Sequence, residues 1–301
     1  MSVEKPAQKV IASPSRTYDE ALASLRTMRQ RDDARIAPVA RTAFFDRGSR
    51  LPWCVVLFHG LTNHPGQFAE LAPQIYELGV NVLVPRMPLH GYADRMTDAL
   101  AHLTATMLLR KAYEAVDIAT GLGERVAVLG ISMGGLLCAY LAQFRSDVAT
   151  SVPVAPDFGL LQLPRVATSM LAAVVNVLPN MFLWWDPRVK EAQLPKDAYP
   201  RFSTHALMQT LKIGNAVYGA ARHEAPLAAR IATVVNVLDP AVNNAVTKRV
   251  VDEWKSFRDS GIEYVELTGL PKNHDIIDPD NPFARTDVVY PKLIDVLALH
   301  S

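Results

Sequence analysis

The feature that most constrains the fold of this 301-residue chain is a regular alternation of short apolar runs with longer helical patterns. Apolar runs rich in β-branched residues, each bounded by Gly, Pro, Asn or Asp, lie at residues 55–58, 80–84, 126–129, 150–154, 233–238 and 263–267. Such short, nearly continuous runs are typical of strands buried on both faces of a parallel sheet. Helical patterns lie between or beside them at residues 66–78, 96–122, 134–145, 244–260 and 288–300. The alternation predicts an α/β fold with a mostly parallel central sheet and helices on both faces.

Two regions depart from this alternation. Near the N-terminus, Thr17 and Glu20 form a capping box that predicts a helix reaching to about residue 31, and residues 36–46 predict an antiparallel entry strand. Residues 156–230 are apolar, helix-prone and rich in Pro and Trp, without a clear strand. We therefore expect an N-terminal arm and helix in residues 1–35, a core built from residues 36–155 and 231–301, and a helical cap inserted at residues 156–230.

The charge balance excludes several classes of partner. Lys and Arg number 31 against 30 Asp and Glu, so the chain lacks the basic surface expected of a protein that binds nucleic acid or an anionic membrane. Residues 166–185 carry no charge and are long enough for a membrane span, but Asn176, Pro179 and Asn180 interrupt them, so we expect no integral span. These observations favour a small substrate that is neutral or weakly charged.

The expected location is the cytoplasm. The first 20 residues contain no long apolar segment of a secretory signal, and they include acidic residues, which are unusual in organelle transit peptides. Cys54 and Cys138 lie in apolar runs, where a thiol usually behaves as a small buried hydrophobic group, so we expect no structural disulfide. No chelating spacing such as H-x-x-x-H or C-x-x-C occurs, and we expect no metal.

Residues 130–134, Gly-Ile-Ser-Met-Gly, form a G-x-S-x-G motif between the apolar run at 126–129 and the helical pattern that follows. A nucleophilic serine requires this context of strand, turn and helix, because it occupies a strained turn that only small neighbours tolerate. The positive end of the following helix also favours an oxyanion. Ser132 is therefore the predicted nucleophile. A dinucleotide-binding turn is excluded, because G-x-G-x-x-G requires glycine where Ser132 stands.

The apolar run at 55–58 leads into a glycine turn, His59-Gly60-Leu61-Thr62. In acyl transfer one oxyanion donor is the amide after the nucleophile, here Met133, and the second comes from the loop after an earlier strand. Leu61 is the candidate for the second amide, and Gly60 would let the backbone approach the substrate closely. His59 has two interpretations, catalysis or orientation of this loop through a hydrogen bond, and we favour the second.

A base and an acid follow the serine in the order that serine hydrolases built on such a sheet use. His274 lies between the run at 263–267 and the last helical pattern, and it is the candidate base. Asp239 directly follows the run at 233–238 and would hold the imidazole in the correct tautomer. Asp157, which follows the run at 150–154, is the rival acid. We prefer Asp239.

Together these residues resemble the α/β-hydrolase superfamily, and within it the carboxylesterase and monoacylglycerol-lipase branch with a helical cap. The resemblance covers roughly residues 36–300, and the motifs that carry it are FHGLT at 58–62, VPRMPLHG at 84–91, GISMGG at 130–135, LDPAVN at 238–243 and NHDIIDP at 273–279. It implies that His90 and Gly91 shape the base of the pocket and that the chemistry needs no cofactor. Two departures are informative: HGLT replaces the HGGG of another esterase branch, and Ser132 excludes the dehalogenase and epoxide-hydrolase members, whose nucleophile is an aspartate.

The expected cap contains large apolar residues that would roof Ser132 and form a pocket for an acyl or aryl group. They are Phe158, Leu160, Leu161, Met170, Leu171, Met181, Phe182, Leu183, Trp184 and Trp185. Packing of the cap against the sheet is their alternative role. We expect the substrate pocket to be lined by His59, Gly60, His90, Trp184 and Trp185.

The predicted function is hydrolysis of carboxylic esters with apolar acyl or aryl groups through an acyl-enzyme, with Ser132, Asp239 and His274 as the triad. Acyl transfer, and cleavage of an amide or a carbon–carbon bond, are enzyme alternatives on the same triad. A non-catalytic receptor for a small apolar ligand is an alternative of another class, which the complete triad disfavours. The predicted partner is a small-molecule ester, and a homodimer stays open as an oligomeric state.

Overall fold

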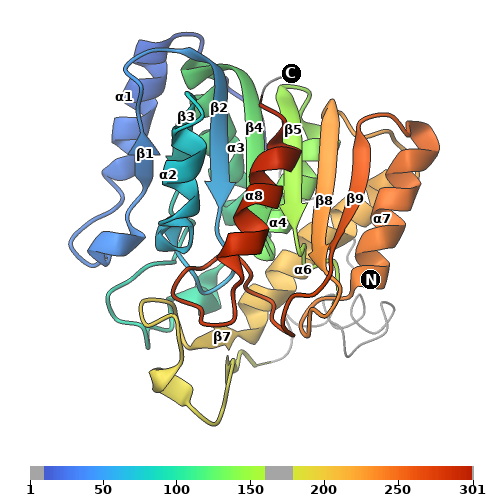
Figure 1. The fold of residues 1–301 in the computed structure, drawn as a ribbon. Coiled ribbons are helices and arrows are strands. Elements are labelled where there is room, and N and C mark those ends of the chain that lie inside the picture. The colour runs from blue at the N-terminus through green and yellow to red at the C-terminus, as the bar shows by residue number, and fades with distance from the viewer. Residues whose placement is uncertain (1–9, 160–178, 300–301) are drawn as a thin grey trace, which may run out of the picture.

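The computed structural model describes residues 10–159 and 179–299. Its centre is a seven-stranded sheet with the strand order β1-β3-β2-β4-β5-β8-β9 (Figure 1). These strands are β1 (Ala43–Phe45), β2 (Leu51–Phe58), β3 (Asn81–Val84), β4 (Gly123–Ile131), β5 (Val148–Val154), β8 (Arg230–Asn236) and β9 (Ile262–Leu267). Every neighbouring pair is parallel except β1 and β3. The mostly parallel sheet and the antiparallel entry strand are therefore confirmed, although the entry strand is shorter than predicted.

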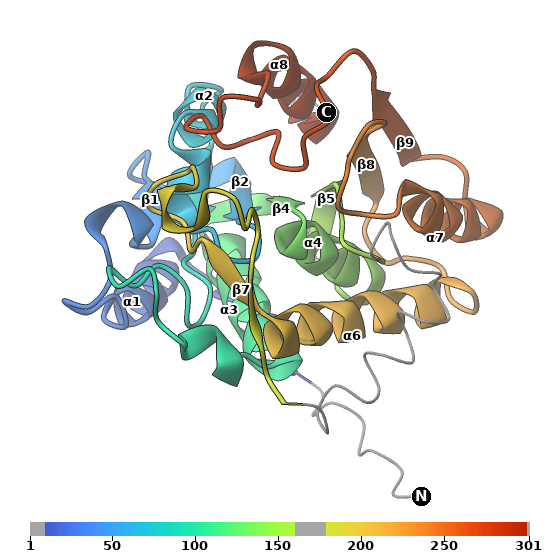
Figure 2. The same cartoon turned by 90° about the horizontal axis from the view of Figure 1, so that it is seen from below.

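Alternate residues of β2 are buried on opposite faces of the sheet, because successive side chains of a strand point to opposite sides. Val55 and Leu57 belong to an apolar cluster with residues of α2 (Leu71–Tyr76) and α8 (Thr286–Leu297). Val56 and Phe58 belong to a second cluster, with residues of α1 (Tyr18–Arg29), α3 (Ala105–Leu122), α4 (Met133–Phe144) and α7 (Asn244–Phe257). Figure 2 shows α2 and α8 on one side of the sheet and α1, α3 and α4 on the other. Helices thus cover both faces, as predicted.

Two of the predicted helices are divided. Residues 96–122 contain a 3₁₀ turn, Ala99–His102, and α3 starts only at Ala105. The hydroxyl of Thr104 accepts a hydrogen bond from the backbone N–H of Met107, which fixes the start of α3. The helix predicted at residues 66–78 is likewise divided into a 3₁₀ turn, Pro65–Phe68, and α2.

The segment between β5 and β8 differs from the expectation that it contains no strand. β6 (Phe182–Trp184) and β7 (Arg201–Ser203) pair antiparallel, with a 3₁₀ turn at Lys190–Ala192 between them. The sequence missed these strands because each pairs over only three residues, too short for a periodic pattern. The apolar residues Leu160, Leu161, Met170 and Leu171, and part of the uncharged stretch at 166–185, lie outside the described residues.

A long helix in the same segment, α6 (Thr204–Ala221), packs against α4, where a Cβ added to Gly214 would lie 3.2 Å from the side chain of Leu136. In Figure 1, β7 and α6 lie beyond the carboxyl ends of the sheet strands. No helix of the described ranges is long and apolar enough to cross a membrane. Cys54 and Cys138 are buried free thiols, as expected.

Candidate active site

Ser132 occupies a sharp turn between β4 and α4, with φ 58° and ψ −115°. This positive φ is strained for a residue with a side chain. Its backbone N–H donates to the carbonyl of Val154 on the neighbouring strand, at 2.9 Å. The two motif glycines are required by contact: a Cβ on Gly134 would lie 1.9 Å from the carbonyl oxygen of Phe58, and one on Gly130 would lie 2.5 Å from that of Gly134. The sequence motif therefore has the geometry of a nucleophile elbow.

The loop after β2 faces this serine. A Cβ added to Gly60 would lie 3.7 Å from the Cβ of Ser132, so the backbone at Gly60 is close to the nucleophile. The carbonyl of Gly60 accepts a hydrogen bond from Nδ1 of His59 at 2.9 Å, which fixes the peptide whose N–H belongs to Leu61. Met133 is the first residue of α4, so its N–H has no acceptor within the helix. Leu61 lines the same pocket as Ser132, and Met133 directly follows that serine, so both expected oxyanion donors follow the carboxyl ends of strands β2 and β4.

His274 and Asp239 form a direct pair. Nδ1 of His274 lies 2.8 Å from Oδ2 of Asp239, whose side chain is fully buried. The other oxygen, Oδ1, accepts the backbone N–H groups of Ala241 and Val242, so the carboxylate is fixed in place. Burial is the largest single influence and acts to lower the pKa of His274, but Asp239, with smaller effects of Asp275 and Asp157, outweighs it and the pKa is raised. This pairing leaves Nε2 of the imidazole for proton exchange with a nucleophile.

Asp157, the rival acid, is placed differently. It follows β5, is 5% exposed, and lies beside the hydroxyl of Thr210 on α6. Burial raises its pKa to about 7, and its Oδ1 has no hydrogen-bond partner among the described residues. It is close enough to the His274–Asp239 pair to interact electrostatically with both residues. The hydrogen bond to the imidazole is made by Asp239, so the geometry favours Asp239 as the acid.

A pocket of about 370 Å³ opens beside Ser132 and His274. Of the expected pocket residues, Gly60 and Trp185 line it, and Trp184 does not. The indole N–H of Trp185 donates to the hydroxyl of Thr62 at 2.9 Å, which joins the segment after β6 to the loop after β2. Sequence reasoning missed most of the remaining wall: the apolar groups of Ile131, Leu194, Pro195, Ala198 and Tyr199, and the polar groups of Asn63, Gln67, Asn273, Asp275 and Asn281.

His59 and His90 differ from the expectation that they line the pocket. Both are 0% exposed, and the wall of the pocket described above does not include them. Nε2 of His59 accepts the backbone N–H of Met87 at 3.1 Å, and Nδ1 of His90 donates to the carbonyl of Pro88 at 2.8 Å. Burial lowers the pKa of His59 well below its ordinary value and that of His90 to about 4, so both rings are neutral. Two neutral, buried rings orient loops, which is the role favoured for His59.

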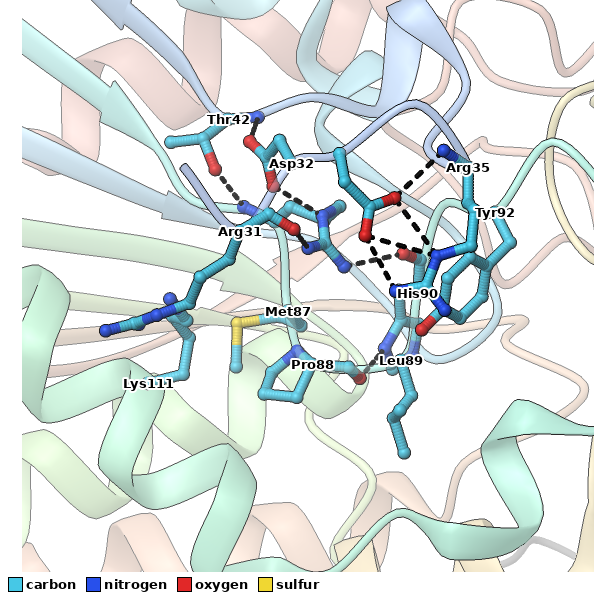
Figure 3. A network of polar contacts seen from close by, with 12 residues as sticks. Arg31, Asp32, Arg35, Thr42, Met87, Pro88, Leu89, His90, Tyr92 and Lys111 are labelled. Carbon is cyan, nitrogen blue, oxygen red and sulfur yellow. Dashed lines mark hydrogen bonds and ion pairs between the residues drawn. The ribbon is translucent and has the colours of Figure 1, made fainter. Parts of the chain in front are cut away.

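The loop that contains His90 is anchored by a buried ion pair. The guanidinium of Arg86 donates to Asp32 at 2.6 Å, to the carbonyl of Arg31 at 2.8 Å and to the carbonyl of His90 at 3.0 Å. The second oxygen of Asp32 accepts the N–H of Thr42 at 2.7 Å. Figure 3 shows Asp32, Thr42 and His90 converging on this network. The segment after α1 therefore fixes Arg86, and the next residue, Met87, donates its backbone N–H to His59.

The fold and this arrangement define a class of protein. The family model described as "Alpha/beta hydrolase family" matches residues 55–286, more than half of the chain, so the chain belongs to the α/β-hydrolase family. Within the described ranges, no group of three or more His, Cys, Asp or Glu side chains could hold a metal ion.

Comparison with individual proteins places the chain among relatives with lipase names. It is 26% identical over 164 residues to a thermostable monoacylglycerol lipase of Bacillus sp. (strain H-257), covering 54% of this chain and 62% of the relative's length. A solved structure of a monoacylglycerol lipase from Paleococcus ferrophilus superposes with a TM-score of 0.65 at 20% identity, over 86% of this chain and 98% of that one. A structure from work on LipS and LipT, two metagenome-derived lipolytic enzymes, gives a TM-score of 0.64 at 19% identity, over 87% and 98%. At these identities the structural matches establish the fold.

Proposed function

We propose that this protein is a serine hydrolase that cleaves carboxylic esters through an acyl-enzyme intermediate. The observation that carries the proposal is the 2.8 Å pair of His274 and Asp239 beside the pocket that also exposes Ser132, the residue of the elbow. A nucleophile, a base oriented by a buried carboxylate and a glycine loop near the nucleophile are the parts that acyl transfer requires.

The mechanism follows from these positions. Nε2 of His274 takes the hydroxyl proton as Ser132 attacks the ester carbonyl, and Asp239 stabilises the imidazolium that forms. The N–H groups of Leu61 and Met133 bind the oxyanion of the tetrahedral intermediate. His274 then gives the proton to the alcohol as the carbon–oxygen bond breaks, and the same residues activate a water molecule that hydrolyses the acyl-enzyme.

The proposed substrates are esters with an apolar acyl or aryl group. Leu61, Ile131, Leu194 and Trp185 supply apolar surface to the pocket. The lipase names of the relatives support this class of substrate. We place the lid of this pocket in a cap at residues 156–230, inserted between core segments 36–155 and 231–301, and we place the enzyme in the cytoplasm, in keeping with its two free, buried cysteines.

Hydrolysis of p-nitrophenyl esters from acetyl to palmitoyl tests the proposal. The wild-type protein should turn over at least one of them, and Ser132→Ala should be inactive while keeping the wild-type unfolding temperature. A fluorophosphonate probe should label Ser132 in the wild-type protein alone. Absence of both turnover and labelling would favour the receptor alternative, and faster cleavage of a matched amide, or transfer to an added alcohol, would favour the other enzyme alternatives.

A further inference from the structure

The geometry points to Gln67 and Asp275 as positioning residues that couple two loops. One is the loop after β2, here called the oxyanion loop, and the other is the loop after β9, here called the histidine loop. This inference rests on the proposed function, because it assigns the two residues a part in the same reaction. Gln67 follows the HGLT turn, and Asp275 directly follows His274. No motif in the sequence relates them, since 208 positions separate them in the chain.

The buried side-chain amide of Gln67 joins the two loops. Oε1 of Gln67 accepts the backbone N–H of Gly60 at 2.8 Å, and Nε2 of the same side chain donates to Oδ2 of Asp275 at 2.8 Å. Gln67 is only 2% exposed, so water competes little for its side-chain amide. The bonds use both ends of the amide, one as acceptor and one as donor, which few other side chains could reproduce.

Side chains bind both peptide groups of Gly60 in the oxyanion loop, the one before it and the one after it. Gln67 binds the N–H of Gly60, while His59 binds the carbonyl of Gly60. The next N–H along the chain is that of Leu61, the proposed oxyanion donor. Its direction is therefore set by these two side chains together with the backbone N–H of Asn63, which also donates to the carbonyl of Gly60 at 3.2 Å. A small rotation of either peptide would misplace it. Misplacement of catalytic groups by about 1 Å can lower a rate about 100-fold.

The histidine loop is equally constrained around Asp275. Oδ1 of Asp275 accepts the N–H groups of Ile277 and Asp278, at 3.2 and 3.1 Å. Its main-chain carbonyl accepts the side-chain amides of Asn273 and Asn281, at 2.6 and 2.9 Å. Because Asn273 and Asp275 flank His274, these bonds fix the backbone that presents the imidazole. Gln67 transmits this position to the oxyanion loop.

Asn63 makes a second contact between the same two loops. Nδ2 of Asn63 donates to Oδ2 of Asp278 at 2.9 Å and approaches Oδ2 of Asp275 at 3.3 Å. The oxygen of the same side-chain amide accepts the backbone N–H of His64 at 2.9 Å, so this side chain joins the two loops without holding the N–H of Gly60. Gln67 is thus the residue whose side chain is expected to affect the chemical step.

Three variants and one control test the inference. Gln67→Leu removes both bonds, Asp275→Ala removes the partner, and the double variant removes the pair. Gln143→Leu is the matched control: Gln143 is 1% exposed and bonds the indole of Trp254 and the carbonyl of Glu224, but it lies at the opposite end of α4 from the elbow. Steady-state kinetics on the best ester and the rate of fluorophosphonate labelling are measured below the unfolding temperature of each variant.

We expect Gln67→Leu and Asp275→Ala each to lower kcat by about 10- to 100-fold with KM changed less than about threefold, because the interaction serves the transition state. The double variant should fall by less than the product of the two single effects, since both substitutions break the bond between Gln67 and Asp275. Gln143→Leu should lower the unfolding temperature but keep kcat within about twofold. A kcat for Gln67→Leu within twofold of wild type, in a protein whose Ser132→Ala variant is inactive, would overturn the inference and leave the proposed function intact.

Gln67→Glu gives a readout that a purely structural role would not. A protonated carboxyl group at this position can accept from Gly60 and donate to Asp275 as the glutamine does, whereas an ionised carboxylate cannot donate. The side chain of Gln67 contacts Asp275, which in turn interacts electrostatically with Asp278 and His274, and Asp278 interacts with Asp280. Lys272 lines the same pocket as Gln67. The ratio of kcat/KM for Gln67→Glu to that of wild type should therefore fall as pH rises.

If the ratio of kcat/KM for Gln67→Glu to that of wild type did not depend on pH, the proposed role of the Gln67 side chain as a hydrogen-bond donor to Asp275 would be contradicted. A wild-type protein that neither turns over esters nor reacts with the probe would instead overturn the proposed function, and this inference with it.

Discussion

The buried carboxylate of Asp239 and the carboxyl group of Asp157 both interact with the imidazole of His274, and their contacts predict different roles for them. Asp239 is hydrogen-bonded to His274, whereas the hydrogen-bond partner of Asp157 is Thr210. Asp239→Asn should therefore lower kcat by about 10³- to 10⁴-fold, because the imidazole loses its orientation and the stabilisation of its charged form. Asp157→Asn should change kcat less than about tenfold. A larger loss for Asp157→Asn in ester kinetics would assign the acid to Asp157 instead.

The pH dependence of the reaction follows from the sign of the His274 shift. Attack by Ser132 needs a neutral imidazole. Burial, the largest single influence, lowers the pKa of His274, but Asp239, Asp275 and Asp157 together raise it above the ordinary 6.5. In the folded protein the proton is thus lost at a higher pH than from a free histidine. We expect kcat/KM to fall below neutral pH with a midpoint above 6.5. A pH profile with a midpoint clearly below that of a free histidine would contradict this.

The raised pKa of Asp157 also predicts how the stability of the protein depends on pH. Its pKa is raised from 3.8 to about 7 by burial, so the folded state binds a proton more tightly than the unfolded state does. The penalty for ionising Asp157 is absent below about pH 4 and complete above about pH 7. Asp157→Asn should therefore stabilise the protein by more at about pH 8.5 than at about pH 5, by up to a few kcal/mol. Urea unfolding at the two pH values measures this, and equal effects would contradict it.

At the scale of elements, the strand, turn and helix around Ser132 allow no side chain at Gly134. A Cβ there would lie 1.9 Å from the carbonyl oxygen of Phe58, so either β2 or α4 must move. Gly134→Ala should destabilise the fold by more than about 2 kcal/mol and abolish labelling of Ser132. Gly219→Ala is the matched control, because Gly219 lies in α6 with open space around its Cα, and it should gain about 0.5–1 kcal/mol. If Gly134→Ala and Gly219→Ala changed the unfolding temperature equally, the turn at Ser132 would be able to relax and admit the added methyl group.

The same elements show what the sequence can reveal. Most strands were predictable because each is an apolar run bounded by Gly, Pro, Asn or Asp. The positions of Ser132, Asp239 and His274 beyond strand ends were predictable because each follows such a run. β6 and β7 were not, since a pair of three-residue strands is stabilised by tertiary contacts that leave no period. The interior positions of His59 and His90, and the bond between Gln67 and Asp275, depend on loops that meet only in the folded chain.

At the scale of the whole molecule, one arginine joins the loop after β3 to the segment that carries the pocket wall. The guanidinium of Arg95 donates to the carbonyls of Ala198 at 2.8 Å, Glu191 at 3.2 Å and Gln193 at 3.4 Å. Tyr199, in the same segment, donates its hydroxyl hydrogen to the carbonyl of Leu89. Gln193, Ala198 and Tyr199 line the pocket, so its shape depends on contacts between parts of the chain about 100 residues apart.

Arg95→Met keeps the length of the side chain but removes all three bonds, and it should therefore loosen this wall without touching the triad. We expect KM for the preferred ester to rise about three- to tenfold, with a smaller change in kcat, because apolar contacts to bound substrate weaken while the positions of Ser132 and His274 persist. Arg188→Met is the matched control in the same segment, since Arg188 is 87% exposed and pairs only with Asp186 among the described residues. It should leave both constants within about twofold, as expected for an exposed ion pair. A fall in kcat as large as the rise in KM for Arg95→Met would mean that this segment also orders the triad.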